Sequence, residues 1–328
     1  MEETTAQTAQ LLSPEVVTFG ETMGCLIPTS PKGIEYTPHF HHLFGGAESN
    51  VAIGIARLGH RAGWFGRLGR DPIGRMIFKK LRGEGVDVSQ AVLTADANTG
   101  LMLREVVSGR SSVYYYRRHS AASLMKPEDL NEEYIRQAKI LHVTGITPAL
   151  SDSCRETVFA AIRIARQHGV KVCFDPNLRM KLWSLDEARP VLLALAEECD
   201  YFLPGQDELA LLYDTDDFDH IIDRLHQLQA VSVVKGGDNC TYLVAEGKVQ
   251  AVPYFSVDRN RVVDTVGAGD GFCAGFISGL LKGLSLLEAV RLGNLVGSLV
   301  IQFEGDWEGA PTWEQVQALL NEEKHIER

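Results

Sequence analysis

Asp264-Thr265-Val266-Gly267-Ala268-Gly269-Asp270 is a glycine-rich stretch that runs directly into an apolar segment. Apolar side chains recur in that segment at helical spacing, at Phe272, Phe276, Ile277, Leu280 and Leu281. This pattern predicts a loop that becomes a helix at the glycines. Small residues let the backbone approach a ligand, and the free N–H groups and positive dipole end of a helix start attract anions. The stretch therefore predicts a phosphate-binding site.

Asp270 follows the glycines directly, in a position suited to a base. A carboxylate there can take the proton from a substrate hydroxyl as that oxygen attacks a phosphoryl group. The alternative is a plain glycine-rich turn in which Asp270 only complements the helix dipole. So short a motif does not decide between these two interpretations by itself.

The composition favours a globular protein that handles small molecules. The chain has 328 residues, of which 45% are hydrophobic, enough for one large core with a small appended lobe. Its 32 basic and 43 acidic residues give a net charge of −11, and the basic ones are dispersed. Neither nucleic acid nor a membrane is therefore expected as a partner. No apolar run reaches the ~18 residues that span a bilayer.

The cysteines and the N-terminus indicate a cytoplasmic location. The six cysteines lie far apart and form no C-x-x-C pair, as expected of reduced thiols. Residues 1–13 are polar and acidic, without the basic start and apolar centre of a signal peptide. We expect them to form a disordered tail.

Strand-like and helix-like segments alternate along most of the chain. Short β-type runs occur at 16–20, 63–66, 140–144, 170–174, 201–203 and 231–234. Amphipathic segments occur between them, at 50–58, 73–82, 151–168 and 186–198. The alternation predicts an α/β fold over residues 14–328, a doubly wound and mostly parallel sheet flanked by helices.

Two regions break this alternation. Residues 34–44 are β-like, and 101–107 with 111–118 are typical of a hairpin that turns at 108–110. Because no crossover helix accompanies them, we expect a small β-sheet lid, formed by about 25–44 and 98–119, that closes over a substrate and excludes water. A decorative or dimerising flap is the alternative, and one sheet can serve both roles.

A second glycine-rich loop, Gly45-Gly46-Ala47-Glu48-Ser49-Asn50, also opens a helix, and 69–74 is a further turn-to-helix start. In this order and spacing, these loops and the 264–270 stretch resemble the two signature regions of the ribokinase-like family of carbohydrate kinases. The resemblance covers nearly the whole chain. It implies a sugar held by Gly45, Gly46 and Asn50, with ATP along the carboxyl edge of the sheet.

The same resemblance implies the roles of further residues. The γ-phosphate would lie at Gly267, Ala268 and Gly269, beside Asp270 as catalytic base. The residues implied to bind the nucleotide are Asp175, Asn177, Lys235, Gly237, Thr265, Gly267, Gly269 and Asn294. Ordinary roles remain open for some of these, such as a surface turn for Lys235, a helix-face polar group for Asn294 and an Asx turn for Asp175 and Asn177.

A magnesium ion is implied beside the phosphates, with Glu208 acting on it through water. Gly205 departs from the family pattern, which often has Asn or Ser after the proline at 204. A monovalent cation is a further candidate cofactor. His39, His41 and His42 lack the spacing of a metal site, and no G-x-S-x-G, H-E-x-x-H or Walker lysine motif occurs.

Three segments, 119–123, 146–150 and 174–183, look like the 2-keto-3-deoxygluconate kinase branch of the family. That likeness implies substrate contacts from Tyr115 and Arg117 in the lid and from Arg179 in a core loop. Guanidinium groups bind carboxylates bidentately, whereas a neutral sugar needs no such pair. The expected reaction is phosphorylation of the 6-hydroxyl of 2-keto-3-deoxygluconate, giving 2-keto-3-deoxy-6-phosphogluconate.

Alternatives to this function remain open. The tyrosines at 114–116 are also ordinary sheet residues, and Arg117 can pair across strands with Glu105. A neutral-sugar kinase such as fructokinase or ribokinase is one rival, and a catalytically idle sugar or nucleotide sensor is another. Alternation puts Val113 and Tyr115 on one face of the lid and Tyr114 and Tyr116 on the other, so a homodimer through the outer face is expected.

Overall fold

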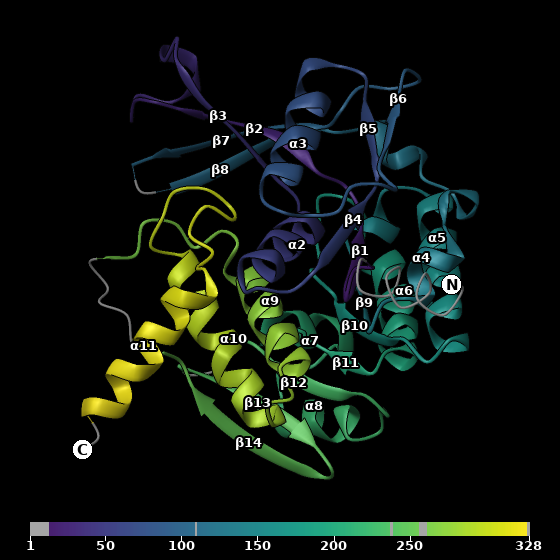
Figure 1. The fold of residues 1–328 in the computed structure, drawn as a ribbon, viewed down its shortest axis with the longest axis vertical. Coiled ribbons are helices and arrows are strands. Elements are labelled where there is room, and N and C mark those ends of the chain that lie inside the picture. Colours follow the sequence, from purple (N-terminus) through teal and green to yellow (C-terminus); the bar gives the residue numbers. More distant parts are fainter. Residues whose placement is uncertain (1–12, 109, 237–238, 256–260, 327–328) are drawn as a thin grey trace, which may run out of the picture.

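The strands that the alternation predicts belong to one eight-stranded sheet (Figure 1). The structure is a computed structural model that describes residues 13–108, 110–236, 239–255 and 261–326. The strand order is β14-β13-β12-β11-β10-β9-β1-β4. The strands are β1 (Val16–Phe19), β4 (Ala62–Phe65), β9 (Ile140–Thr144), β10 (Lys171–Asp175), β11 (Tyr201–Phe202), β12 (Val231–Val234), β13 (Cys240–Ala245) and β14 (Lys248–Pro253). Each of the six predicted strands is present.

The sheet is parallel from β4 to β12 and antiparallel beyond it. Strands β1, β4 and β9 are buried at every position, as expected of parallel strands covered on both faces. Strand β1 pairs with β4 on one side and with β9 on the other, so the chain winds outward in both directions. The α/β fold class is confirmed, while the antiparallel hairpin of β13 and β14 was not predicted.

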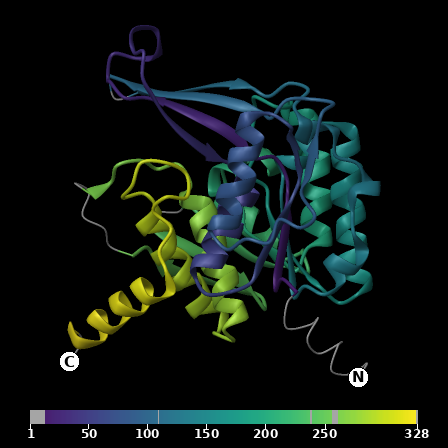
Figure 2. The ribbon, with the colours of Figure 1, turned by 45° about the horizontal axis from the view of Figure 1, so that its top comes forward.

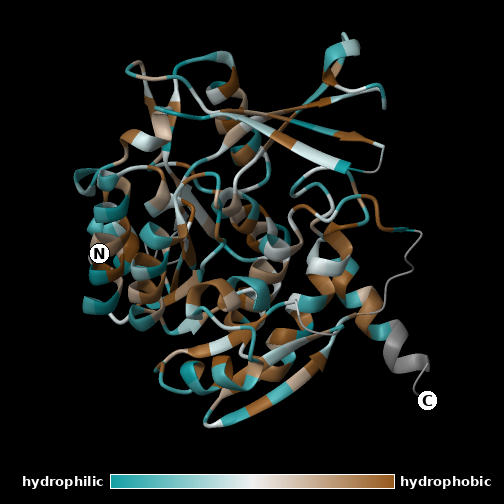
Figure 3. Ribbon diagram, turned by 180° about the vertical axis from the view of Figure 1, so that it is seen from behind, coloured by the Kyte–Doolittle hydropathy of each residue, from teal (hydrophilic) through white to brown (hydrophobic). Residues whose placement is uncertain are grey.

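Helices cover both faces of the sheet. One face packs against α5 (Asp152–Gln167), α6 (Leu185–Glu198), α7 (Gln206–Tyr213) and α8 (Phe218–Leu225). The other packs against α2 (Ala47–Arg57), α3 (Pro72–Gly83), α9 (Ala268–Leu281) and α10 (Leu286–Val300). Hydrophobic residues, brown in Figure 3, alternate with hydrophilic ones along the outer helices, whereas α2 and α9 are buried on all sides over most of their length.

The remaining elements outside the lid complete the structure. They are α4 (Glu132–Arg136), α11 (Trp313–Ile326), the 3₁₀ turns η2 (Ala121–Leu124), η3 (Pro127–Asp129) and η4 (Thr147–Ala149), and a two-stranded sheet of β5 (Arg67–Gly69) and β6 (Val92–Thr94). Local sequence explains several helix starts. Ser184 caps α6 and Ser285 caps α10, each in a capping box with the glutamate three residues later.

A separate four-stranded sheet projects from the core, as the predicted lid (Figure 2). Its order is β3-β2-β7-β8, formed by β2 (Met23–Pro28), β3 (Phe40–Gly45), β7 (Leu101–Val107) and β8 (Arg110–Tyr116). The start of the β-like 34–44 region is instead a 3₁₀ turn, η1 (Ile34–Tyr36). A small apolar cluster of its own holds this sheet together, at Met23, Cys25, Ile27 and Met102.

The structure tests the predicted disordered tail at its last residue alone, and there the prediction is wrong. Ser13, which we expected in the disordered tail, is buried and donates a hydrogen bond to Gln137; residues 1–12 lie outside the described part of the chain. Every one of the six cysteines is buried. Within the described residues, no helix combines the length and apolar character needed to cross a bilayer.

Candidate active site

A cavity of about 1450 Å³ lies between the lid and the carboxyl ends of the core strands. Most predicted site residues line it: Gly45, Gly46, Asn50, Tyr115, Arg117, Asp175, Asn177, Arg179, Glu208, Lys235, Thr265, Gly267, Gly269 and Asp270. Ligand pockets usually measure ~300–1,000 Å³, so this one has room for two ligands side by side. Gly237 lies outside the described residues.

The predicted phosphate cradle lies where the 264–270 stretch enters α9. Gly267 precedes the helix with φ 80°, in the left-handed region, and Ala268 is its first residue. A Cβ at Gly267 would lie 1.9 Å from the carbonyl oxygen of Asp306, so both conformation and space require glycine. The first N–H groups of a helix have no partner within it, and Gly267 and Gly269 at this helix start line the cavity.

Asp270 joins the two glycine-rich loops. Its Oδ2 accepts a hydrogen bond from Asn50 Nδ2 at 2.7 Å, and Asn50 Oδ1 in turn accepts one from the Gly46 N–H at 3.3 Å. Burial raises the pKa of Asp270 to about 7; the Asn50 bond opposes this rise and the Asp175 carboxylate adds to it. A carboxyl group that titrates near neutral pH suits a general base.

Asp175 and Lys235 form an ion pair at the carboxyl end of β10. Asp175 Oδ2 accepts from Lys235 Nζ at 2.8 Å, and its Oδ1 accepts from the Asn177 N–H at 3.2 Å, which is the expected Asx bond. The Lys235 side chain is only 18% exposed, so a plain surface turn is the wrong interpretation. Burial alone would lower the pKa of Lys235, but the Asp175 carboxylate outweighs it and the pKa is raised. Lys235 therefore remains charged at the cavity wall.

Asn177 and Glu208 shape the neighbouring loop. Asn177 has φ 39°, and its Oδ1 is buried without a partner among the described residues, so it is free to meet a ligand. Glu208 Oε1 accepts from the Leu178 N–H at 2.6 Å and its Oε2 from the Gly205 N–H at 2.7 Å. Burial and the nearby Asp175 raise the pKa of Glu208. Its water-mediated role toward magnesium stays a prediction.

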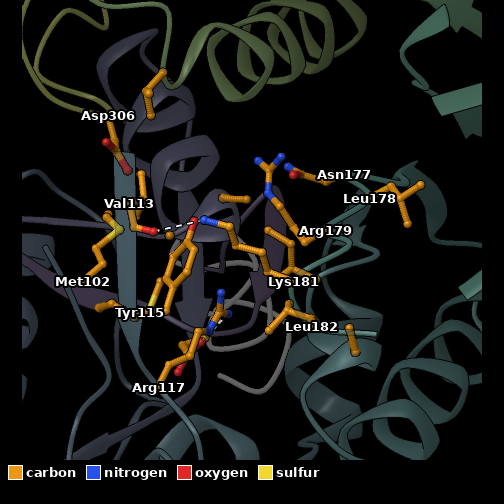
Figure 4. A pocket seen from close by; sticks show the side chains of 18 of the residues that line it. Met102, Val113, Tyr115, Arg117, Asn177, Leu178, Arg179, Lys181, Leu182 and Asp306 are labelled. Atoms are coloured by element: carbon orange, nitrogen blue, oxygen red, sulfur yellow. Dashed lines mark hydrogen bonds and ion pairs between the residues drawn. The ribbon is translucent and has the colours of Figure 1, made fainter. Parts of the chain in front are cut away.

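Arg117 extends from the end of β8 into the cavity, beside Tyr115 (Figure 4). It forms an ion pair with buried Glu21, whereas Glu105 accepts from the Ile34 N–H and the Tyr114 hydroxyl. Arg117 thus pairs with Glu21 rather than with Glu105, so the alternative of a cross-strand pair does not hold for it. The Arg117 guanidinium lies 5.4 Å from the Tyr115 ring centroid, and its Nε has no hydrogen-bond partner within the described residues.

Arg179 and Lys181 face the lid from the loop after β10 (Figure 4). Arg179 is exposed, pairs with no carboxylate in the described part of the chain, and its charge lowers the pKa of Asp270. Lys181 was not predicted. Its Nζ donates to the Val113 carbonyl at 3.0 Å and lies 5.5 Å from the Tyr115 ring centroid, so it ties this loop to the lid. The sequence signal that could have identified Lys181 is its position in the same loop, two residues after Arg179.

Asp306 was also missed. It lines the cavity from the loop that follows α10, and a Cβ at Gly45 would lie 2.0 Å from its Oδ2. The two glycine-rich loops thus both pack against Asp306. Burial raises the pKa of its carboxyl to about 6, although the nearby Arg104 opposes that rise. No periodic pattern marks this loop, so only its spatial position identifies it.

Asn294 and Ala268 do not line the cavity. Asn294 Oδ1 accepts from Thr241 Oγ1 at 2.7 Å, and its Nδ2 donates to the carbonyls of Pro253 at 3.0 Å and Val252 at 3.4 Å. These bonds fix α10 against β13 and β14. Its contact with a nucleotide stays a prediction, and so does that of Ala268 with a phosphate.

Comparison with known proteins gives consistent results. Residues 13–313 match the family described as pfkB family carbohydrate kinase. A 2-dehydro-3-deoxygluconokinase of Bacillus subtilis is 40% identical over 320 residues, covering 95% of this chain and 97% of that protein. Fructokinase-1 of Zea mays is 32% identical over 93% of this chain and 97% of its own. A crystal structure of a PfkB protein from Polaromonas sp. JS666 superposes with a TM-score of 0.85, at 37% identity, over 93% of this chain and 100% of that one.

Proposed function

Because this chain belongs to the pfkB family of carbohydrate kinases and is an ATP-dependent sugar kinase, we propose that it phosphorylates 2-keto-3-deoxygluconate, also called 2-dehydro-3-deoxygluconate. The product is 2-keto-3-deoxy-6-phosphogluconate. The similarity to the Bacillus subtilis enzyme supports this substrate over a neutral hexose, since the Zea mays fructokinase is less similar.

One observation carries the proposal: cationic side chains gather at the lid end of the cavity of an acidic protein. Arg117 from the lid and Lys181 from the core loop lie beside Tyr115, and Arg179 lines the same cavity from that loop (Figure 4). Glu21 balances the charge of Arg117, so Arg179 and Lys181 supply the net positive charge. A sugar acid brings the carboxylate that such groups bind.

The opposite end of the cavity supports the phosphoryl transfer. Asp270 takes the proton of the 6-hydroxyl as that oxygen attacks, and Asn50 holds its carboxylate. The N–H groups at the start of α9 and the Lys235 ammonium stabilise the negative charge that develops on the transferred group. The lid excludes water, which would otherwise compete with the sugar hydroxyl.

ATP supplies the phosphoryl group, and Mg²⁺ neutralises its phosphates when bound. The unpartnered Asn177 Oδ1, charged Lys235 and the glycine cradle fit a nucleotide triphosphate. The described residues hold no cluster of three or more His, Cys, Asp or Glu that could bind a metal. Mg²⁺ commonly keeps its waters and binds through phosphates and one or two carboxylates, which is the role we assign to Glu208. A monovalent cation remains a further candidate.

A homodimer through the lid is part of the proposal, as is a cytoplasmic location. Tyr36, Tyr114 and Tyr116 are 72%, 48% and 65% exposed on the lid. Exposed aromatic groups on the lid sheet and on the turn beside it favour contact with a second copy, and a standard two-fold interface buries ~1,600 Å² in total.

A substrate panel tests the function. Purified protein is assayed for ADP release with 2-keto-3-deoxygluconate, 2-keto-3-deoxygalactonate, fructose and ribose. We expect kcat/KM for a keto-deoxy acid to exceed that for either neutral sugar by about 10- to 100-fold, the worth of one charged bidentate contact. Preference for fructose would favour the fructokinase alternative, and the absence of any turnover would favour the idle sensor.

A further inference from the structure

A buried arginine of the lid reaches the phosphate cradle. Arg104 lies in β7 and its side chain is 4% exposed. Its Nη2 lies 2.8 Å from Asp264 Oδ2, and its Nη1 donates to Asp306 Oδ1 at 3.0 Å. One guanidinium thus bridges a carboxylate of the 264–270 stretch and a carboxylate of the loop after α10.

Both carboxylates are part of the structure that holds Gly267. Asp264 Oδ1 accepts from the Val266 N–H at 3.1 Å, which shapes the turn just before Gly267. A Cβ added at Gly267 would lie 1.9 Å from the carbonyl oxygen of Asp306, so the Asp306 backbone packs directly against Gly267. Arg104 therefore holds the chain on both sides of the residue that starts α9. A displacement of either carboxylate would move the cradle N–H groups.

The loop after α10 is the meeting place of lid and core. It lies between the lid strands and α9 in both Figures 1 and 2. The lid also contacts this loop through His41 and Glu304, at 3.1 Å, and through the Phe44 carbonyl, which accepts from Trp307 Nε1 at 3.1 Å. Neither contact includes a group from the 264–270 stretch. Arg104 alone, among the ion pairs of the described residues, connects the lid to that stretch.

The desolvation of this guanidinium argues for a purpose beyond stability. A buried charged network is often no more stable than apolar residues of the same volume, because each ion loses its hydration. The bidentate fork of arginine does fix the geometry of two carboxylates at once. Such precision is needed where N–H groups must point at a transferring phosphoryl group.

We propose that Arg104 is a positioning residue for phosphoryl transfer, through which the lid sheet sets the geometry of the phosphate cradle. Arg104 lines the cavity, but carboxylates hold both of its terminal nitrogens, so in this scheme it acts through Asp264 and Asp306 rather than by binding the sugar or the nucleotide. The inference rests on the proposed function to this extent: the protein must be a sugar kinase that uses this cradle. The identity of the sugar does not matter. Loss of Arg104 should therefore reduce kcat and leave both KM values nearly unchanged.

The experiment compares Arg104→Met and Arg104→Lys with a matched control. Arg57→Met is the control, because Arg57 Nη1 donates to the carbonyls of Trp307, Glu308 and Ala310 in the same loop and its Nε to Glu84. It supports the loop without touching Asp264 or the Asp306 carboxylate. Thermal melts and steady-state kinetics are measured on all variants with the best sugar of the wild type.

For Arg104→Met we expect kcat to fall by about 10²-fold, the usual effect of a misplacement near 1 Å, with each KM within about threefold of wild type. Arg104→Lys should recover part of the rate, since it keeps the charge but not the fork. Arg57→Met should lower the melting temperature and keep kcat within about threefold of wild type, because it leaves the cradle carboxylates in place.

Either of two results overturns the inference. One is an Arg104→Met enzyme that matches Arg57→Met, with lower stability and an unchanged kcat. The other is a defect confined to KM. If Arg104→Met does not fold, Arg104→Lys decides, and a wild-type kcat in that variant refutes the role. A wild type that turns over no sugar would instead refute the proposed function.

Discussion

Removing the Asn50 amide should shift the pH dependence of the kinase toward alkaline pH. Asn50 Nδ2 donates to Asp270 Oδ2 at 2.7 Å and so favours the ionised carboxylate, whose pKa burial raises to about 7. A hydrogen bond to a charged group is worth about 1.5–3 kcal/mol, and one pKa unit corresponds to about 1.4 kcal/mol. Asn50→Ala should therefore raise the pKa of Asp270 by about one to two units.

The sign of the effect on rate follows from the role of Asp270. A general base works only when deprotonated, so kcat/KM rises with pH through the pKa of Asp270 and then levels off. At pH 7 about half of the wild-type enzyme has the active form, but only about a tenth to a hundredth of Asn50→Ala does. Relative to wild type at the same pH, the kcat/KM of the variant should therefore be lower at pH 7 than on the alkaline plateau by a further factor of about 5 to 50.

The assay couples ADP release to a spectrophotometric signal and records kcat/KM from about pH 5.5 to about pH 9.5, at constant ionic strength, so that the midpoint of the acid limb lies within the range for both enzymes. Asp270→Asn is the control; it should lose ~10²- to 10⁴-fold at every pH while still binding ATP. An acid limb whose midpoint is the same in Asn50→Ala and wild type, with activity lowered equally at all pH values, would refute the reasoning. Asn50 would then act on the sugar alone.

Other predictions follow from the remaining parts of the site. Arg117→Ala and Arg179→Ala should each raise the KM for the keto-deoxy acid by about 10- to 100-fold and change that for fructose little; equal losses for both sugars in steady-state assays would show that neither arginine binds a carboxylate. Gly267→Ala should lower the free energy of unfolding by about 1–3 kcal/mol, seen as unfolding at lower urea concentration, and should lose nearly all turnover. The reason is that its Cβ would lie 1.9 Å from the Asp306 carbonyl oxygen. Wild-type stability together with wild-type turnover would contradict that close approach. Tyr116→Asp should sediment as a monomer where the wild type sediments as a dimer, since Tyr116 is 65% exposed on the outer lid; a wild type that stays at monomer mass well into the micromolar range would exclude dimerisation through the lid.

Local patterns were sufficient to predict the core of the fold. Strands β1, β9 and β12 are short apolar runs, and the helices between strands show their apolar period directly in sequence. The 264–270 stretch predicted the start of α9 because glycine placement and helix periodicity coincide there. These signals depend only on neighbouring residues, so one sequence reveals them.

Contacts between distant segments could not be predicted in the same way. Val113, Tyr115 and Arg117 line the cavity, as alternation along β8 predicted, but so do Tyr114 and Arg118, which alternation put on the other face. The partner of Arg117 could not be predicted, since a cross-strand pair with Glu105 was only one alternative and three-dimensional packing brings Glu21 beside it instead.

The residues around Asp306 show the same limit. Arg104, Asp306 and Lys181 meet the site from a lid strand, a loop after α10 and a loop after β10, with no shared periodicity. A buried charge in a strand or an aspartate in an irregular loop resembles many surface residues until its partners are known. The hairpin of β13 and β14 was missed because its outer strand is largely exposed and carries little apolar signal.

The burial of all six thiols provides two separate reporters of motion. Cys25 lies in β2 of the lid, where burial raises the pKa of its thiol to about 12, and Cys273 lies in α9, where burial likewise raises the thiol pKa. A thiol reagent reaches each one only when the structure covering it opens, so the labelling rate measures the free energy of that local opening. Alkylation at Cys25 would time the release of the lid, and alkylation at Cys273 would time the opening of the core beneath the phosphate cradle.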